Sequence, residues 1–318
     1  MTKRAFTFPG QGSQVIGMGQ DLAQTYPEAR AVFDEVDDAL GENLSGLIFE
    51  GTEDQLRLTR NAQPALMSVS MAVISVLEAK GITLEKDSSF VAGHSLGEYS
   101  ALCAAGTFSL ADTARLLRIR GDAMQSAVPV GAGAMAAILG LDLAAVQELA
   151  ESAAYGDVCE VANDNAPGQV VVSGASSAIE RAVELAKAAG AKRALMLPVS
   201  APFHCSMMAP AAETMEQALT HVQMNIPVVP VVSNVTVTPV TDPAEIRKNL
   251  IAQVTGMVRW RESIAWLSGQ NEGEGGVGEL LEIGSGKVLT GLARRINRDV
   301  KGIALGTPAD IDNFVAGL

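Results

Sequence analysis

Ser95 lies within residues 93–97 (GHSLG), which match the pattern G-x-S-x-G of a nucleophile elbow. An apolar run at 90–92 precedes the motif, and a helix is predicted to follow it. A sharp strand-to-helix turn would expose the serine hydroxyl, and we expect the two glycines to let a substrate approach closely. The helix that begins at Leu96 would aim free main-chain N–H groups at a developing oxyanion. The motif therefore predicts acyl chemistry on a serine nucleophile.

A serine nucleophile needs a base, usually a histidine, and the sequence contains three. His94 adjoins the serine, so its side chain should point to the opposite face. His221 ends a predicted helix and is interpreted as a surface residue near a helix C-terminus. His204 follows a predicted strand, and strand ends are where α/β folds place catalytic groups. By elimination, we predict that His204 is the base.

The group that would orient His204 is less clearly indicated. In α/β-hydrolases an acidic residue lies between the serine and the histidine in the chain. Asp157 and Asp164 have that position, but both fall in a predicted separate subdomain. A neutral amide oxygen can also accept the second ring N–H of a histidine. Gln253, at the end of a predicted helix, is one option that periodicity alone does not select.

Arg120 indicates a substrate that carries a carboxylate. A helix is predicted over 110–126, with Ser109 as its N-cap. At ~100° per residue, Arg120 falls just beside the apolar stripe, Arg118 slightly further off and Arg115 on the far side. A guanidinium at the rim of a buried face can bind a carboxylate through two parallel hydrogen bonds. The alternative, a side chain that extends to water, fits this pattern equally well.

The charge balance limits the classes of partner. The 318 residues include 23 basic and 36 acidic side chains, a net charge of −13. This argues against nucleic-acid binding, which needs a basic field. An anionic substrate would need basic groups that are concentrated locally. Three segments could supply them, each with a solvated helix face as the alternative: Arg115, Arg118 and Arg120; Lys192 and Arg193; Lys287, Arg294, Arg295 and Arg298.

Cysteine usage and hydropathy suggest a compartment. The three cysteines show no metal or disulfide spacing, which suits a reducing cytosol. No stretch reaches the ~18 apolar residues of a membrane span, and the N-terminus has no signal-peptide core. We therefore expect a cytoplasmic protein without membrane contact, metal or cofactor. Residues 284–287 (GSGK) are not a P-loop, because the first glycine is missing and Val288 replaces Ser or Thr.

Alternating strands and helices predict an α/β protein with a mostly parallel sheet. A separate β-α-β-β-α-β order predicts a ferredoxin-like subdomain over 130–200, inserted into a core made of 1–129 and 201–318. Residues 270–278 are predicted to form a surface loop. The predicted strands are 4–8, 88–92, 134–139, 158–162, 169–173, 194–199, 228–233, 279–283 and 302–305. The predicted helices are 17–25, 29–40, 44–49, 64–80, 96–105, 110–126, 143–154, 178–189, 210–222, 244–254, 287–296 and 311–318.

Several independent motifs, in a consistent order, resemble one family. Over essentially its whole length the chain resembles the malonyl-CoA:acyl carrier protein transacylases of type II fatty acid synthesis. The matching segments are 8–14 (FPGQGSQ), 61–66 (NAQPAL), 93–99 (GHSLGEY), 118–121 (RIRG), 165–169 (NAPGQ), 203–204 (FH), Gln253 with Trp260, and 282–287 (EIGSGK).

The resemblance implies a hydrolase-like α/β core with a ferredoxin-like insert. It also implies roles: Ser95 would carry the acyl group, His204 would be the base and Arg120 would bind the malonyl carboxylate. Main-chain N–H groups of Gln11 and Leu96 would form the oxyanion hole.

Three further residues follow from the resemblance. A main-chain or side-chain carbonyl of Gln253 would orient His204, while Gln63 and Asn163 would line the pocket. One departure leaves the detail of a loop open, because residues 255–257 (TGM) follow Gln253 where the family often has a proline.

The implied reaction moves a malonyl group from malonyl-CoA to the phosphopantetheine thiol of acyl carrier protein through a malonyl-serine intermediate, with ping-pong kinetics. Malonyl-CoA and acyl carrier protein are the expected partners, and a monomer is expected. Three alternatives remain: a serine esterase or thioesterase that uses water, a non-catalytic binding subunit, and a trans-acting acyltransferase of polyketide assembly. Selectivity between malonyl and methylmalonyl groups is not indicated.

Overall fold

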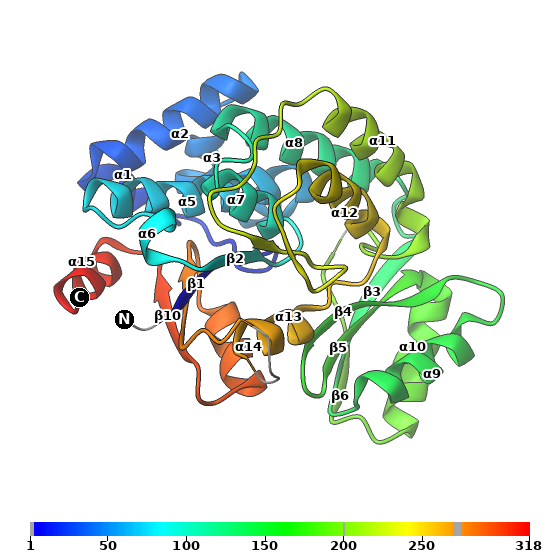
Figure 1. The fold of residues 1–318 in the computed structure, drawn as a ribbon. Coiled ribbons are helices and arrows are strands. Elements are labelled where there is room, and N and C mark those ends of the chain that lie inside the picture. Colours follow the sequence, from blue (N-terminus) through cyan, green and yellow to red (C-terminus); the bar gives the residue numbers. More distant parts are fainter. Residues whose placement is uncertain (1–2, 200, 270–274) are drawn as a thin grey trace.

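The chain forms two sheets of different size, and the computed structural model describes residues 3–199, 201–269 and 275–318 (Figure 1). The larger sheet has the strand order β10-β9-β1-β2-β7-β8. Its neighbouring strands all pair in parallel except β7 and β8. The predicted α/β class with a mostly parallel sheet is therefore confirmed. Its strands are β1 (Arg4–Phe8), β2 (Phe90–Gly93), β7 (Val231–Val232), β8 (Pro239–Val240), β9 (Glu279–Ile283) and β10 (Lys301–Leu305).

The smaller sheet is antiparallel, with the order β4-β5-β3-β6. Along the chain its elements run β3-α9-β4-β5-α10-β6, the predicted β-α-β-β-α-β arrangement. The exact domain boundaries stay a prediction, and residue 200 lies outside the described residues. These elements are β3 (Gly133–Leu139), α9 (Leu143–Ala154), β4 (Cys159–Ala166), β5 (Gln169–Ala175), α10 (Ser176–Ala188) and β6 (Arg193–Met196).

Helices cover both faces of the larger sheet (Figure 1). One face packs on the largest apolar cluster, which includes residues of α2, α5, α7, α8 and α11, and the other packs on α13 and α14. The helices are α1 (Gln20–Thr25), α2 (Pro27–Leu40), α3 (Leu44–Glu50), α4 (Glu53–Arg57), α5 (Thr59–Ala79), α6 (Leu84–Asp87), α7 (Gly97–Ala104), α8 (Leu110–Ser126), α11 (Ala209–Thr220), α12 (Pro243–Thr255), α13 (Trp260–Leu267), α14 (Val288–Ile296) and α15 (Pro308–Ala316), with a 3-10 turn η1 (Ser206–Met208).

Helix α5 is the central helix of the core. It is long and apolar enough, by length and composition, to cross a membrane, which the sequence did not lead us to expect. Because 78% of its most apolar stretch is buried by other parts of the chain, it is a core helix here. It begins at Thr59, one turn before the predicted start at Pro64. A proline inside a helix leaves the carbonyl four residues earlier without its partner, and Arg118 Nη1 donates to this carbonyl, that of Arg60, at 2.8 Å.

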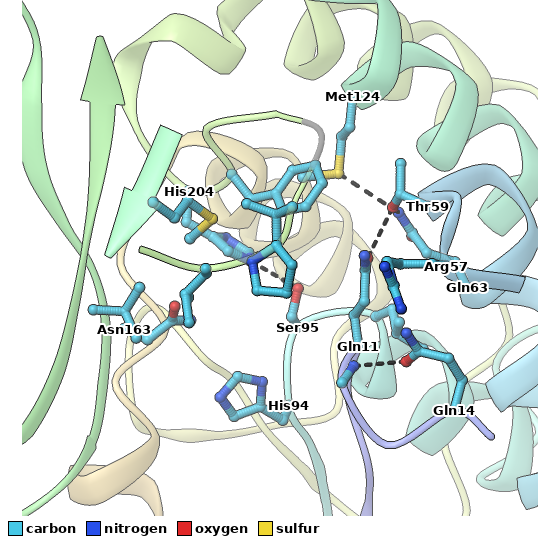
Figure 2. A pocket seen from close by; sticks show the side chains of 18 of the residues that line it. Gln11, Gln14, Arg57, Thr59, Gln63, His94, Ser95, Met124, Asn163 and His204 are labelled. Carbon is cyan, nitrogen blue, oxygen red and sulfur yellow. Dashed lines mark hydrogen bonds between the residues drawn. The ribbon is translucent and has the colours of Figure 1, made fainter. Parts of the chain in front are cut away.

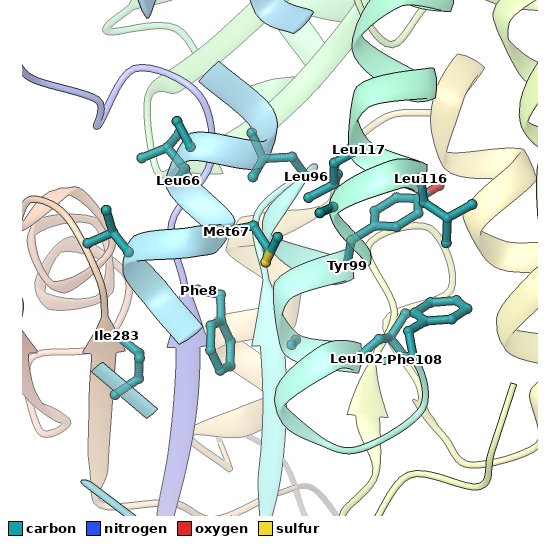
Figure 3. Packing of buried hydrophobic residues seen from close by; sticks show 14 of the residues in the cluster. Phe8, Leu66, Met67, Leu96, Tyr99, Leu102, Phe108, Leu116, Leu117 and Ile283 are labelled. Carbon is teal, nitrogen blue, oxygen red and sulfur yellow. The ribbon is translucent and has the colours of Figure 1, made fainter. Parts of the chain in front are cut away.

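Helix α7 packs its apolar side chains against α5 and α8 (Figure 3). Leu96, Tyr99 and Leu102 are fully buried or nearly so, and Met67 of α5 and Leu117 of α8 lie around them. Each fully buried side chain of this size contributes about 1.5–3 kcal/mol. The turn that precedes α7 is therefore anchored on a rigid part of the core.

The small sheet is joined to the core along β4. The N–H of Asp164 donates to the carbonyl of Val258 at 3.0 Å, and the N–H of Val258 donates to Ala162 at 2.8 Å. The Asp164 carboxylate, which is 1% exposed, also pairs with Arg261 of α13 at 2.8 Å. These contacts fix the small sheet beside the carboxyl ends of β1 and β2, where the candidate site lies.

Several predicted bounds differ from the structure, and β4 is the clearest case. Strand β4 continues to Ala166, through most of the predicted turn at 163–168, because register shifts let it stay paired with β5. The predicted loop at 270–278 lies partly outside the described residues, which resume at 275.

Candidate active site

Ser95 lies in the sharp turn between β2 and α7, with φ 53°. A Cβ on Gly93 would lie 1.8 Å from the carbonyl oxygen of Gly97, and one on Gly97 would lie 2.2 Å from the carbonyl oxygen of Phe8. The glycines therefore allow strand, turn and helix to approach one another. That they also let a substrate approach closely stays a prediction.

His204 meets the serine hydroxyl from the other side of the site. Its Nε2 lies 2.7 Å from Ser95 Oγ, and its Nδ1 lies 2.8 Å from the main-chain carbonyl oxygen of Gln253. Because a carbonyl can only accept, Nδ1 carries the proton and Nε2 is free to accept from the serine. Burial, and then the charge of Arg120, lower the pKa of His204 to about 3. The ring is therefore neutral at pH 7, as a general base must be.

Gln253 contributes its main-chain carbonyl to this arrangement, not its side chain, which settles the geometry that the sequence left open. The two carboxylates considered from the sequence lie elsewhere. Asp157 pairs with Arg181 at 3.0 Å, and Asp164 pairs with Arg261.

Arg120 is buried beside the serine, with 1% of its surface exposed. Its Nη2 donates to Ser95 Oγ at 3.1 Å and to the side-chain Oε1 of Gln253 at 2.8 Å, and its Nη1 donates to Oε1 of Gln63 at 2.7 Å. The guanidinium carbon also lies 5.6 Å from the centre of the Tyr99 ring. The side chain therefore points into the site and does not extend to water. One of its donors faces the hydroxyl that would carry an acyl group, so it can bind a carboxylate on that group.

A second layer of polar side chains holds these groups. The side-chain Nε2 of Gln253 donates to the Ser95 carbonyl at 2.9 Å and to Glu98 Oε2 at 2.6 Å. Asn234 Oδ1 accepts from the Ser95 N–H at 2.8 Å, and its Nδ2 donates to the Gly93 carbonyl at 2.7 Å. The turn is thus pinned from both sides by buried amides.

The two residues predicted to supply the oxyanion donors also line the pocket. They are Leu96 and Gln11, and Figure 2 shows Gln11 beside Ser95. For the main-chain N–H of either residue, no hydrogen-bond acceptor is found among the described residues. The side chain of Gln11 is held by Thr59, whose hydroxyl donates to Oε1 at 2.9 Å. Strands β1 and β2 pair with Phe8 opposite Gly93, so the loop after β1 lies beside the elbow.

The pocket has a volume of about 450 Å³ and lies between the two sheets (Figure 2). Gln63 and Asn163 line it, as the resemblance implied, and Asn163 comes from β4 of the small sheet. His94 also lines the pocket, although it was expected to face away, and its Nε2 pairs with Asn165 Oδ1 at 2.8 Å. His221 is exposed at the C-cap of α11, as predicted.

The basic segments proposed from the sequence behave differently from one another. Of their members, only Arg120 lines the pocket. Arg118 donates instead to Asn61, in a buried contact, and to Glu42, whose side chain is partly exposed. Lys287 lines a separate cavity of about 280 Å³. Arg57 lines the active pocket but was missed, because α4 is too short to show a periodic pattern.

Glu98 and Asn234 were also missed. Glu98 is a carboxylate in the first turn of a helix whose residues 97–103 are all buried, and that burial becomes visible only in the structure. Asn234 follows a two-residue strand and carries no signal either. Within 3–199, 201–269 and 275–318, no group of three His, Cys, Asp or Glu side chains is placed to hold a metal ion.

The chain matches known proteins over nearly its full length. Residues 5–267 match the family described as "Acyl transferase domain". The malonyl CoA-acyl carrier protein transacylase of Bacillus subtilis is 48% identical, covering 98% of this chain and 96% of that protein. The protein of the same name from Escherichia coli K12 is 47% identical, covering 97% of each chain.

Solved structures agree with these matches. The acyl-carrier-protein-S-malonyltransferase of Bartonella henselae is 59% identical and superposes with a TM-score of 0.96 over 99% of each chain. A malonyl-transacylase solved in complex with a type II polyketide synthase acyl-carrier protein is 42% identical, with a TM-score of 0.95 over 100% of each chain.

Proposed function

The chain belongs to the acyl transferase domain family, and from that premise we propose that it is a malonyl-CoA:acyl carrier protein transacylase. In this proposal, it moves malonyl groups to the phosphopantetheine thiol of the carrier through a malonyl-serine intermediate. One observation supports malonyl as the acyl group. The Arg120 guanidinium, buried and held by two amide oxygens, lies 3.1 Å from the Ser95 hydroxyl. A carboxylate attached to an acyl group on Ser95 would meet it.

The first half-reaction acylates the enzyme. Ser95 Oγ attacks the thioester carbonyl carbon of malonyl-CoA while its proton moves to His204 Nε2. The oxygen that becomes negative lies at the free N–H groups of Leu96 and Gln11, and such donors are worth about 3 kcal/mol each. The carbon–sulfur bond then breaks, the imidazolium returns its proton to the departing thiolate, and malonyl-Ser95 remains.

The second half-reaction repeats these steps with another thiol. The phosphopantetheine sulfur gives its proton to His204 and attacks the malonyl-serine ester. The carbon–oxygen bond breaks, Ser95 regains its proton, and malonyl-carrier protein leaves.

The partner of His204 suits thiol chemistry. The Gln253 carbonyl fixes the tautomer of the ring but carries no full charge to stabilise the imidazolium. A thiol is a much better leaving group than an amine, so less help from the acid is needed. This supports thioester exchange over amide hydrolysis, and the buried arginine favours it over a general esterase, which has no use for a cation there.

The proposal includes a cytoplasmic enzyme that works as a monomer. All the groups used in the two half-reactions come from one chain, so the site needs no second subunit. Arg57, which lines the pocket with about half of its side chain exposed, adds a cation for an anionic CoA ester.

The covalent step is tested by intact mass. With malonyl-CoA alone, the protein should gain one malonyl group, and Ser95→Ala should gain none. Ser100→Ala is the matched control, since it removes a buried hydroxyl from α7, the helix that follows Ser95, and should still be acylated. An adduct on the Ser95→Ala protein would place the nucleophile elsewhere.

The acceptor is tested by comparing carriers with water. Malonyl-CoA should be consumed rapidly when holo acyl carrier protein is present and only slowly in buffer alone. Rapid hydrolysis without the carrier would instead identify a thioesterase. Parallel assays with fatty acid and polyketide carriers would separate the two pathways.

A further inference from the structure

We propose that Glu98 is a positioning residue for malonyl recognition, which acts through the side-chain amide of Gln253 to hold Arg120 against the substrate carboxylate. This inference rests on the proposed function but concerns a residue that takes no part in the two half-reactions.

The geometry begins with the carboxylate itself. Glu98 is 3% exposed, in the first turn of α7. Its Oε2 accepts from Gln253 Nε2 at 2.6 Å, and its Oε1 accepts from the Asn234 N–H at 3.4 Å. With both oxygens accepting, the hydrogen bonds fit the ionised form. A short bond to a charged acceptor is among the stronger ones available to an amide.

This bond helps to fix which way the Gln253 amide faces. A carboxylate cannot donate, so the NH₂ end of the amide must turn toward Glu98, where it also reaches the Ser95 carbonyl at 2.9 Å. The Oε1 end is then directed at Arg120 Nη2, at 2.8 Å. The Ser95 carbonyl, which can only accept, and Arg120, which can only donate, favour the same orientation of the amide. The carboxylate adds the shortest and only charged contact to the NH₂ end, so its loss would weaken the restraint on the amide.

The guanidinium depends on that orientation. Its Nη2 shares its two protons between Gln253 Oε1 and Ser95 Oγ, and its Nη1 gives one to Gln63 Oε1. Among the described residues, Arg120 Nε has no hydrogen-bond partner, so the bonds to the two amide oxygens hold the guanidinium in place. If Gln253 Oε1 no longer accepted from Arg120, the Nη2 end of the guanidinium, which is nearest Ser95, would be free to move.

Charge supports the same connection. Burial raises the pKa of Glu98 to about 7, while the bonds from Gln253 and Asn234 and the charge of Arg120 act in the opposite direction. Above neutral pH, Glu98 is thus a nearby anion for an arginine whose hydrogen-bond partners are neutral groups. Because Glu98 acts on Arg120 through Gln253 and not by direct contact, the guanidinium donors that face Ser95 stay available to the substrate carboxylate.

The test is the ratio of kcat/KM for malonyl-CoA to that for acetyl-CoA, with acyl carrier protein as the acceptor. Glu98→Met removes both acceptor oxygens but keeps an unbranched side chain, and it should lower this ratio about tenfold, the loss expected for hydrogen bonds to charged groups. Acetyl transfer should change little, because acetyl does not use Arg120. Glu98→Gln keeps one acceptor for Gln253 and should restore most of the ratio.

Two comparisons separate positioning from a structural role. In an Arg120→Ala background, Glu98→Met should not change the ratio further, since the residue through which it acts is gone. Glu282→Met is the matched control, because Glu282 is equally buried, accepts from the N–H groups of Leu289 and Thr290, and is in β9. It should lower thermal stability and leave the ratio unchanged.

Three results would overturn the inference: malonyl and acetyl transfer falling in equal proportion in Glu98→Met, a further fall of the ratio in the Arg120→Ala background, or a loss in Glu98→Gln as large as that in Glu98→Met. Failure of the wild-type protein to transfer malonyl at all would instead reject the proposed function.

Discussion

His204 illustrates how a single residue is prepared for catalysis by its surroundings. It is 4% exposed and has φ 58°, and it is held between a serine hydroxyl and a main-chain carbonyl. The cost of burying an imidazolium and the nearby Arg120 charge both keep the ring neutral. A malonyl carboxylate paired with Arg120 would offset that charge, so the ring would become a stronger base when the intended substrate is bound.

The lowered pKa of His204 predicts a pH effect on stability. Between the ordinary pKa of 6.5 and about 3, the unfolded chain binds a proton at this position and the folded chain does not. Acidification through this window therefore favours unfolding. From about pH 7.5 to about pH 5, the wild type should lose ~2 kcal/mol more stability than His204→Ala. Glu98, whose raised pKa acts in the opposite direction, is present in both proteins and cancels in the difference.

Urea unfolding of both proteins at the two pH values measures this effect. A difference in stability that stays constant with pH would mean that His204 titrates near its ordinary pKa.

Arg120 predicts a change in substrate preference. Arg120→Ala should lower kcat/KM for malonyl-CoA about a hundredfold or more, because two charge-assisted hydrogen bonds are lost, and should leave acetyl-CoA transfer largely intact. Arg115→Ala is the control, since that side chain lies on the same helix with 54% of its surface exposed. Steady-state assays with malonyl-CoA and acetyl-CoA measure kcat/KM for both thioesters. Equal losses for the two would show that Arg120 does not recognise the malonyl carboxylate.

At the level of residues, sequence reasoning is most useful where chemistry demands a motif. Ser95 and His204, which the structure brings to 2.7 Å, could be paired in advance because few residue types can act as nucleophile and base. The main-chain carbonyl of Gln253 could not, since any residue can supply one and only the path of the chain decides which does. Glu98 escaped for a related reason: its partner is 155 positions away in the chain.

At the scale of elements, the elbow depends on a strand, a turn and a helix that touch through their main chains. Gly97→Ala should destabilise the protein by about 1–3 kcal/mol, because the added Cβ would meet a main-chain oxygen that cannot easily move. The displaced turn should also lower activity about a hundredfold, the cost of a misplacement near 1 Å. Thermal unfolding and malonyl transfer measure the two effects.

Gly291→Ala is the matched control. Gly291 lies within α14, and a Cβ added there would meet nothing within 4 Å. This change should stabilise the protein by about 0.5–1 kcal/mol through helix propensity and leave activity unchanged. If both alanine variants behave alike, contact at the elbow is not what requires a glycine.

Elements with clear start and stop signals were predictable. Helix α8 begins after its Ser109 cap as expected, and the bounds of α9 and β9 match those predicted. The short helices α4 and α6 have five and four residues, too few to show a helical period. Helix α13 was missed although Trp260 is fully buried, because eight residues without a side-chain cap give little local signal.

At the scale of the whole molecule, the ion pair between Asp164 of β4 and Arg261 of α13 contributes to the attachment of the small sheet to the core. Arg261→Met would leave the Asp164 carboxylate, 1% exposed, without its partner and should cost about 1–3 kcal/mol. Lys187→Met breaks an exposed pair with Glu184 in the small sheet's own helix and should cost less than about 1 kcal/mol. Hydrogen exchange should show faster exchange along β4 in the first variant alone. Unchanged exchange there would mean that main-chain contacts to Val258 suffice.

The arrangement around the pocket separates two properties of the enzyme. The serine, its base and the arginine come from the larger part of the chain, whereas Met135, Asn163, Val171, Leu197 and Val199 form the opposite wall and come from one continuous segment. We expect that grafting the corresponding segment of a relative would alter which acyl chain lengths are accepted and leave the ability to form an acyl-serine intact. Acyl chain length and acyl activation would then diversify independently, while the choice of a carboxylate-bearing acyl group stays with Arg120 in the larger part.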